Sequence, residues 1–292
     1  METLGFIGLG VMGEPMCRNL ARKSGCRVLG HDLSAAPLER LAADGVKPAH
    51  AAREIAERAD VVFLSLPSGA EVEAICAGES GLVALARAGQ AIVDLGTSPV
   101  ALARSLAAAL AAREAAFADA PVARTREAAI AGTLSVMVGA DAATFRRVQP
   151  LLATMASDVT HCGGPGAGQL VKLLNNMVLA QTVVALAEAL ATARRSGVDA
   201  KLVFEALAKG SADSFALRNQ GMKALLPGAF PERAFSAEYM LKDLRYAIAT
   251  ARESGLKLRG AHNALELLEA TIAAGYGREY WPALYKIVDG PP

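Results

Sequence analysis

Lys172, Asn175 and Asn176 are the residues of this chain whose types and spacing best suit chemistry. They stand in the run GGPGAGQLVKLLNNM, residues 163–177, where a glycine-rich entry opens a strongly apolar helix. Because residues three and four apart on a helix share a face, the three side chains form one polar spot. Desolvation among Leu, Val and Met lowers the pKa of a lysine toward the range useful for proton transfer. The alternative is a lysine that reaches solvent from an amphipathic helix, and this helix alone leaves both open.

A second motif lies near the start of the chain, where the apolar run 4–8 leads into GLGVMG, residues 8–13. Gly8 permits a tight turn, Gly10 lets the backbone approach a pyrophosphate, and Gly13 lets a helix and a strand pack closely. The pyrophosphate would bind at the N-terminus of the following helix, where N–H groups and the helix dipole favour an anion. The predicted cofactor-binding loop consists of Gly8, Leu9, Gly10, Val11, Met12 and Gly13.

Asp32 ends a second predicted strand, 27–31, and lies 24 residues after Gly8. This spacing is typical of a carboxylate that accepts the ribose hydroxyls of NAD. A carboxylate there repels the 2′-phosphate of NADP, and the first arginine after it is Arg40. We therefore expect NAD as the cofactor, with NADP as the alternative. For Asp32 itself, the alternative is a turn position ahead of the next helix.

The composition limits the function classes. The 292 residues fit two domains, and a hydrophobic content of 53% suffices for a substantial core. Thirty basic and 29 acidic residues give a net charge of +1, which favours no nucleic-acid partner. The four cysteines lack metal-ligand spacing, so we expect no metal site and reduced thiols in a cytoplasm. Because a strand is predicted to start near Met1, we expect no signal peptide, and because the longest apolar stretch, 177–187, is short, we expect no membrane span.

Strand patterns alternate with helix patterns in the first half of the chain. The predicted strands are 3–8, 27–31, 60–66, 90–95, 115–119, 134–138 and 158–161. Continuous apolar strands with intervening helices indicate a mainly parallel sheet that is covered on both faces. We therefore predict an α/β, Rossmann dinucleotide-binding domain over residues 1–163.

After Gly168 the strand signals end, and a long helix over about 167–195 opens an all-helical part. The further predicted helices are 199–209, 214–224, 236–254, 260–275 and 281–288. We assign residues 164–292 to an all-α domain that begins with this interdomain helix. Because the long helix is apolar on nearly all sides, we expect a second subunit to cover it, in a homodimer or a homotetramer.

Four motifs in this order resemble the β-hydroxyacid dehydrogenase family: GLGVMGEPM at 8–16, DAPVART at 119–125, GAGQLVKLLNN at 166–176 and KDL at 242–244. The family includes 3-hydroxyisobutyrate dehydrogenase and tartronate semialdehyde reductase, and the resemblance covers essentially the whole chain. It implies a Rossmann domain joined to a helical domain, a nicotinamide cofactor, and reversible oxidation of a β-hydroxy acid to its semialdehyde. It also implies roles for six residues: Lys172 as general acid/base, Asn176 orienting the substrate, Lys242 and Asp243 closing over the nicotinamide, and Leu66 and Pro67 lining the cofactor cleft.

The substrate loop departs from the family pattern. Small residues and backbone amides in the family's DAPVSGG hold a carboxylate, whereas Ala123, Arg124 and Thr125 stand at the last three positions here. This form resembles sulfolactaldehyde reductase, whose three-carbon substrate bears a sulfonate. A guanidinium fork matches sulfonate, phosphate or carboxylate. We therefore expect Arg124 and Thr125, with nearby backbone N–H groups, to clamp the acid group of the substrate. We also expect Ala123, Asn175 and Lys242 among the substrate-binding residues. The alternative for Arg124 is a solvated side chain.

The turn after the fifth predicted strand departs as well. The family's D-x-S-T reads Asp94-Leu-Gly96-Thr97 here, with Ser98 one place later, and we expect Thr97 to contact the cofactor. The expected reaction is hydride transfer between NAD(P) and a small acidic aldehyde or β-hydroxy acid. The alternatives within this chemistry are 3-hydroxyisobutyrate dehydrogenase proper and 2-hydroxy-3-oxopropionate reductase.

More distant alternatives are oxidative decarboxylation, imine reduction and a non-catalytic cofactor-binding protein. Decarboxylases of the 6-phosphogluconate type carry a histidine where this chain has Asn175, and imine reductases usually replace the lysine. Retention of Lys172 and the lack of a basic extension disfavour the non-catalytic alternative.

Overall fold

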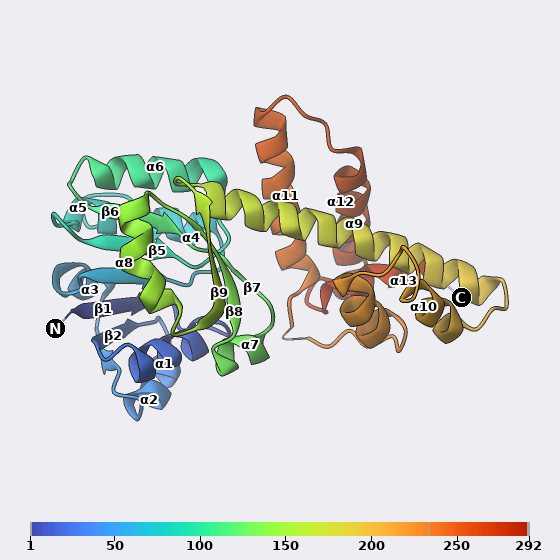
Figure 1. The fold of residues 1–292 in the computed structure, drawn as a ribbon, viewed down its shortest axis with the longest axis horizontal. Helices are drawn as coiled ribbons and strands as arrows, with labels where there is room; N and C mark the ends of the chain where they lie inside the picture. The colour runs from blue at the N-terminus through green and yellow to red at the C-terminus, as the bar shows by residue number, and fades with distance from the viewer. Residues whose placement is uncertain (1, 233, 291–292) are drawn as a thin grey trace. The chain divides into compact units, whose positions relative to one another are not determined.

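The protein is described by a computed structural model that covers residues 2–232 and 234–290. The chain forms two compact units, residues 1–172 and 173–292. The division falls inside one long helix, α9 (Ala167–Arg195), a little beyond the boundary expected at residue 163 (Figure 1).

The first unit contains nine strands and eight helices among its described residues. The strands are β1 (Thr3–Ile7), β2 (Arg27–His31), β3 (Lys47–Pro48), β4 (Val61–Leu64), β5 (Ala91–Asp94), β6 (Ala116–Asp119), β7 (Val122–Ala123), β8 (Leu134–Gly139) and β9 (Ala156–Gly163). The helices are α1 (Gly13–Lys23), α2 (Ala35–Ala42), α3 (Ala52–Arg58), α4 (Gly69–Cys76), α5 (Leu82–Leu85), α6 (Val100–Ala111), α7 (Arg126–Ala131) and α8 (Ala142–Leu152).

The strands form one sheet in the order β3-β2-β1-β4-β5-β6-β8-β7, with β9 paired to β8. Strands β3 to β6 along this order are parallel, whereas β8 is antiparallel to both β6 and β7. The first six positions follow the 3-2-1-4-5-6 order of a Rossmann fold, so the predicted fold class is confirmed. Strands β3 and β7, of two residues each, were not predicted.

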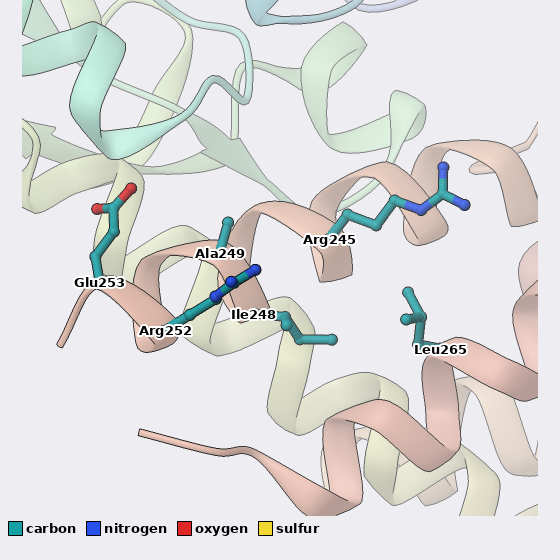
Figure 2. Close-up of a pocket in the computed structure, with 6 residues that line it drawn as sticks. All are labelled: Arg245, Ile248, Ala249, Arg252, Glu253 and Leu265. Carbon is teal, nitrogen blue, oxygen red and sulfur yellow. The ribbon is translucent and has the colours of Figure 1, made fainter. Parts of the chain in front are cut away.

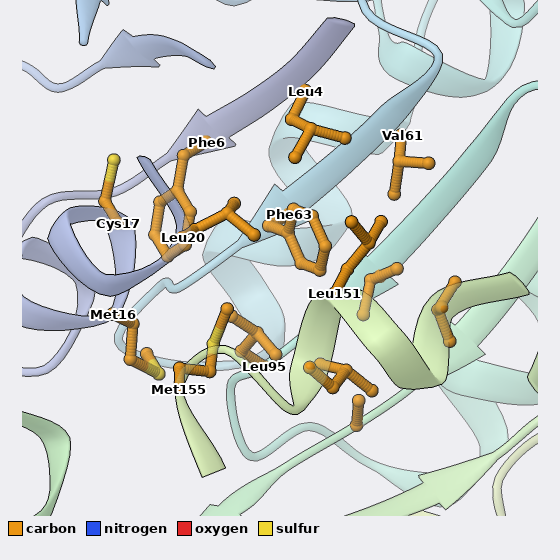
Figure 3. Close-up of a cluster of buried hydrophobic side chains, with 14 of the residues drawn as sticks. Leu4, Phe6, Met16, Cys17, Leu20, Val61, Phe63, Leu95, Leu151 and Met155 are labelled. Carbon is orange, nitrogen blue, oxygen red and sulfur yellow. The ribbon is translucent and has the colours of Figure 1, made fainter. Parts of the chain in front are cut away.

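Successive side chains of a strand point to opposite faces of the sheet. Both faces are buried, because helices cover each of them. On one face the rings of Phe6 and Phe63 stack with centroids 6.0 Å apart, beside residues of α1 and α8 (Figure 3). On the other face Val62 and Leu64 pack with side chains of α3, α4 and α6. This two-sided burial explains why the strands read as continuous apolar runs.

The described residues of the second unit are helical, as predicted, apart from two isolated β-bridges. After α9 come α10 (Ala200–Leu207), the π-helix η1 (Leu217–Leu225), α11 (Ala237–Glu253), α12 (Arg259–Thr271), the π-helical turn η2 (Ile272–Tyr276), the 3₁₀ helix η3 (Trp281–Leu284) and α13 (Tyr285–Asp289). A separate core of buried side chains, centred on Phe204, Leu268 and Trp281, holds these helices together. The chain therefore has one core on each face of the sheet and a third in the helical unit.

Helix α9 has 29 residues and is long and apolar enough to cross a membrane, by length and composition alone. Its most apolar 18-residue window has a mean hydropathy of 1.6, and 44% of that window is buried in the structure. The apolar stretch 177–187 alone is too short for a span. The 18-residue window is longer because it includes polar side chains, and it still has a high mean hydropathy. A core helix passes the same test, so this property is weak evidence for a membrane.

Candidate active site

The three glycines of the first motif occupy three different environments. Gly8 has φ +90°, and a Cβ there would lie 2.3 Å from the backbone oxygen of Ser65. A Cβ on Gly13 would lie 2.0 Å from the oxygen of Gly8, so α1 can pack against the end of β1 only through a glycine. A Cβ on Gly10 would meet nothing within 4 Å. The open space above Gly10 fits a ligand that approaches the backbone, as a pyrophosphate does.

Asp32 lies against this glycine loop. Its carboxylate accepts hydrogen bonds from the backbone N–H groups of Leu9 at 2.6 Å and Ser34 at 2.8 Å. The first bond ties the end of β2 to the loop after β1, and the second shapes the turn into α2. Asp32 is half-buried, and its expected bond to the ribose hydroxyls stays a prediction.

Two further turns adjoin the glycine loop. Leu66, which follows β4, has its Cδ2 atom 3.1 Å from the position of a Cβ on Gly8. Its backbone oxygen lies 3.0 Å from the position of a Cβ on Gly96, in the turn that carries Thr97 after β5. Pro67 is the exposed residue after Leu66. The turns after β1, β4 and β5 therefore meet at the carboxyl edge of the sheet, where open α/β sheets bind their ligands.

Ser98 does not replace the family's missing serine. It is 1% exposed, and its hydroxyl donates to Asp94 Oδ2 at 2.7 Å. The hydroxyl of Ser98, one place further along the chain, therefore lies in the protein interior, whereas Thr97 is half-buried.

Two buried polar residues of this unit, Asp119 and Gln169, were not among the predicted site residues. Asp119 accepts hydrogen bonds from the backbone N–H groups of Gly166 at 2.6 Å and Gln169 at 2.7 Å, so it caps the N-terminus of α9. Burial raises the pKa of Asp119, against the lowering effect of these donors. Its place as the first residue of DAPVART is the signal that could have identified it.

In the substrate loop, Arg124 has φ +85°, a left-handed conformation that suits the glycine of the family pattern. Its guanidinium donates to the hydroxyl of Ser157 and to Asp158 Oδ2, each at 2.7 Å, and to the backbone oxygen of Thr133. We expected the N–H groups of the guanidinium to be open to a substrate, whereas in the structure they bond to residues of β9 and to Thr133. Chain segments distant in the sequence supply these partners, so the motif could not reveal them.

The other residues of the loop are placed as follows. Ala123 ends β7 and is half-buried, and Thr125 is the exposed residue that precedes α7. A hydrogen bond with the Thr125 side chain lowers the pKa of Glu127. The loop therefore leaves the sheet at β7 and ends at the start of α7.

Lys172 is half-buried on α9 and is the last residue of the first unit. Asn176 follows one helical turn later, in the second unit, and is 3% exposed. Its Nδ2 donates to Asp243 Oδ2 at 2.7 Å, and its Oδ1 accepts from Asn175 Nδ2 at 3.1 Å. The carboxamide of Asn176 is therefore held from both ends.

Asp243 joins two predicted site residues instead of standing open to a cofactor. It is 1% exposed, and its Oδ1 lies 2.8 Å from Lys242 Nζ. The Lys242 ammonium also lies 5.2 Å from the centroid of the Tyr246 ring, which adds a cation–π contact. The observed partners of Asp243 are Asn176 and Lys242, and the expected contact of Asp243 with the nicotinamide stays a prediction.

A shallow hollow of about 550 Å³ lies along α11 and α12 (Figure 2). It is lined by Arg245, Ile248, Ala249, Arg252, Glu253 and Leu265. None of the predicted site residues lines it, and Arg245 is paired with Glu269 at 2.8 Å. We therefore do not assign the chemistry to this hollow.

The Rossmann sheet, the glycine loop of residues 8–13 and Asp32 are the features of an NAD(P)-dependent oxidoreductase. A family model described as the NAD binding domain of 6-phosphogluconate dehydrogenase matches residues 3–164. A second, described as the NAD-binding domain of NADP-dependent 3-hydroxyisobutyrate dehydrogenase, matches residues 166–288. The chain belongs to the β-hydroxyacid dehydrogenase family, which confirms the resemblance drawn from its motifs.

Individual relatives match over nearly the whole chain. The chain is 34% identical to 2-(hydroxymethyl)glutarate dehydrogenase of Eubacterium barkeri, over 97% of this chain and 94% of that protein. It is 33% identical to NAD-dependent L-serine dehydrogenase of Pseudomonas aeruginosa, over 99% of this chain and 98% of that protein. A solved structure of Mycobacterium tuberculosis 3-hydroxyisobutyrate dehydrogenase with L-serine matches with a TM-score of 0.89 at 33% identity. The match covers 99% of this chain and 100% of that one.

Proposed function

We propose that this enzyme interconverts a small β-hydroxy acid, or its sulfonate analogue, and the corresponding semialdehyde. The observation that carries the proposal is the pair Lys172 and Asn176, one turn apart on α9, with the Asn176 carboxamide fixed by the buried Asp243. A proton carrier beside an oriented amide suits a carbonyl oxygen that gains or loses a proton. The names of two relatives, a 2-(hydroxymethyl)glutarate dehydrogenase and an NAD-dependent L-serine dehydrogenase, support the substrate class.

Bound NAD(P) supplies or accepts the hydride. Lys172 Nζ gives a proton to the carbonyl oxygen during reduction and removes it from the hydroxyl during oxidation. Asn176 Nδ2 has two hydrogens, of which Asp243 accepts one, and the second donates to the substrate oxygen. Because Asp243 and Asn175 hold the amide, the reacting geometry is formed before the substrate arrives.

Arg124 and Thr125, with nearby backbone N–H groups, hold the acid group of the substrate in this proposal. Arg124 must then exchange Asp158 for the substrate anion. The two side chains are 42% and 55% exposed, and exposed ion pairs are worth only about 0–1 kcal/mol. An anion desolvated in the site can therefore compete with Asp158.

We also propose that the enzyme works in the cytoplasm as at least a dimer, without a membrane or nucleic-acid partner. Leu174 and Val178 on α9 are 41% and 57% exposed. The same helix carries Lys172, Asn175 and Asn176, which would be costly to place in lipid. A second copy of the chain can pack against the apolar side chains of α9 without placing its polar side chains in lipid.

The test is oxidation of NADH, and separately NADPH, with matched three- and four-carbon aldehydes that carry a carboxylate, a sulfonate, a phosphate or no charge. The reverse assay uses the corresponding β-hydroxy acids, including 3-hydroxyisobutyrate, L-serine and 2-(hydroxymethyl)glutarate. We expect acidic substrates to have the highest kcat/KM and NADH to be preferred. The best substrate would decide between 3-hydroxyisobutyrate dehydrogenase, 2-hydroxy-3-oxopropionate reductase and a sulfonate enzyme. Cofactor binding without turnover on any substrate would favour a non-catalytic family member.

A further inference from the structure

Gln169 is a fully buried polar side chain for which the proposed mechanism has no role so far. It is 0% exposed, on the first turn of α9. Its Oε1 accepts from the N–H of Ser98 at 3.0 Å, and its Nε2 donates to the backbone oxygen of Gly96 at 2.8 Å. Nε2 also lies 3.5 Å from Asp94 Oδ2. Both ends of the amide are therefore bonded to the turn after β5.

The backbone of Gln169 is held as firmly as its side chain. Its N–H donates to Asp119 Oδ2 at 2.7 Å, at the end of β6. The preceding Gly168 lies so close to β8 that a Cβ there would be 2.3 Å from the oxygen of Met137. The first turn of α9 thus has a fixed place relative to the ends of β5, β6 and β8.

This arrangement connects two residues of the proposed site within the first unit. Thr97 lies between the two residues whose backbone groups bond to the Gln169 amide. Lys172 lies three residues after Gln169, on the same face of α9. We propose that Gln169 is a positioning residue: it fixes the turn that carries Thr97 relative to the helical turn that carries Lys172. This inference rests on the proposed role of Lys172.

The chemistry of the site explains why an amide is needed there. The turn presents one N–H group and one C=O group, and a carboxamide is the uncharged side chain that carries both a planar donor and an acceptor. An apolar side chain of similar volume would fill the space but leave both backbone groups without these partners. A glutamate would place a carboxylate against the Gly96 oxygen and the Asp94 carboxylate, and near Lys172.

The experiment compares Gln169→Met and Gln169→Glu with wild type and with Gln181→Met. Gln181 is a matched control, because it is a half-buried glutamine of the same helix that bonds to a backbone oxygen, that of Met177. For each variant we would measure kcat, KM, the NADH dissociation constant, the pH profile of kcat and the melting temperature.

We expect Gln169→Met to lower kcat about tenfold to a hundredfold, with a smaller change in KM, because misplacement of reacting groups by about 1 Å has effects of this order. Gln181→Met should remain near wild type. Gln169→Glu should move the pH profile of kcat to higher pH, because a nearby negative charge raises the pKa of a lysine. A lower melting temperature with unchanged kcat and pH profile would overturn the inference.

Two additions keep the outcome decidable. If Gln169→Glu fails to fold, Gln169→Asn supplies a shorter, uncharged amide, which should lower kcat as Gln169→Met does. Lys172→Ala separates the two proposals. If Lys172→Ala is inactive and the Gln169 variants turn over normally, only the positioning role is wrong. If Lys172→Ala keeps wild-type turnover, the proposed function fails.

Discussion

The carboxamide of Asn176 and the carboxylate of Asp243 share a 2.7 Å hydrogen bond in the interior of the helical unit, between α9 and α11. The second carboxylate oxygen lies 2.8 Å from Lys242 Nζ. One buried acid therefore orients the amide assigned to the substrate and neutralises a neighbouring cation. Its role in the proposed mechanism is geometric, because it holds the Asn176 amide in place.

Removal of this carboxylate tests the arrangement. Asp243→Ala leaves the Asn176 amide and the Lys242 ammonium without their shared partner, and breaking a buried pair in this way costs about 3–5 kcal/mol. We expect a lower urea midpoint together with a loss of kcat, and partial recovery of both in Asp243→Asn. Glu269→Ala, which breaks an exposed ion pair with Arg245, is the control. Equal effects of the two alanine variants would contradict the assignment.

Lys172→Ala should nearly abolish turnover while the protein still binds NADH. The loss of a general acid/base lowers rates by about 10²–10⁴-fold. Steady-state kinetics gives the turnover, and NADH fluorescence titration gives the binding. Lys201→Ala, at an exposed lysine of α10, controls for loss of a positive charge. A Lys172 variant that keeps more than about half of wild-type turnover would exclude Lys172 from the mechanism.

Asp32 should set the preference for NADH over NADPH. Asp32→Ala removes both the ribose acceptor and the charge that repels a 2′-phosphate, so NADH binding weakens and discrimination falls. Asp32→Asn keeps an acceptor for the N–H group of Leu9 while it removes the charge. We therefore expect it to reduce discrimination with less damage to the loop. A wild-type enzyme that already prefers NADPH would disprove this interpretation.

Asp158 and the acid group of the substrate compete for Arg124 in the proposed function. Arg124→Gly should raise KM for acidic aldehydes about tenfold to a hundredfold, since a charged hydrogen bond is worth about 1.5–3 kcal/mol. The left-handed backbone at this position suits glycine, so we expect no loss of stability from backbone strain. KM for a neutral aldehyde of equal size should change little, and Arg124→Lys should rescue only in part.

Asp158→Ala gives the opposite expectation, a lower KM for acidic aldehydes alone. Hydrogen bonds from Ser157 and then from Arg124 lower the pKa of Asp158, so the competing carboxylate is charged at neutral pH. If both variants change acidic and neutral substrates equally, Arg124 braces the loop instead of binding the substrate.

The wild-type chain should be at least a dimer. Light scattering at micromolar concentration measures this directly, without a tag or a ligand. Val178→Glu, at an exposed position of α9, should shift the population toward monomer. A monomeric wild type would refute the proposed cover of this helix.

The sequence could predict the features that depend on local pattern. The glycine loop, Asp32 and the long helix follow from spacing over one strand and one helix, and the family motifs supplied Asn176. Partners far apart in the sequence could not be predicted in this way. Arg124 and Asp158 are 34 positions apart, and Gln169 bonds to Ser98 across 71 positions. Nothing in an apolar helix marks one amide as the residue that secures a distant turn.

The three glycines of the first motif are held by different constraints, with different evolutionary consequences. The backbone conformation and Ser65 require Gly8, and close packing requires Gly13, whereas a Cβ at Gly10 would meet none of the described atoms within 4 Å. Selection for folding alone would therefore preserve the outer two glycines and leave the middle one free to vary. A descendant that stopped using its nucleotide would be expected to vary first at Gly10.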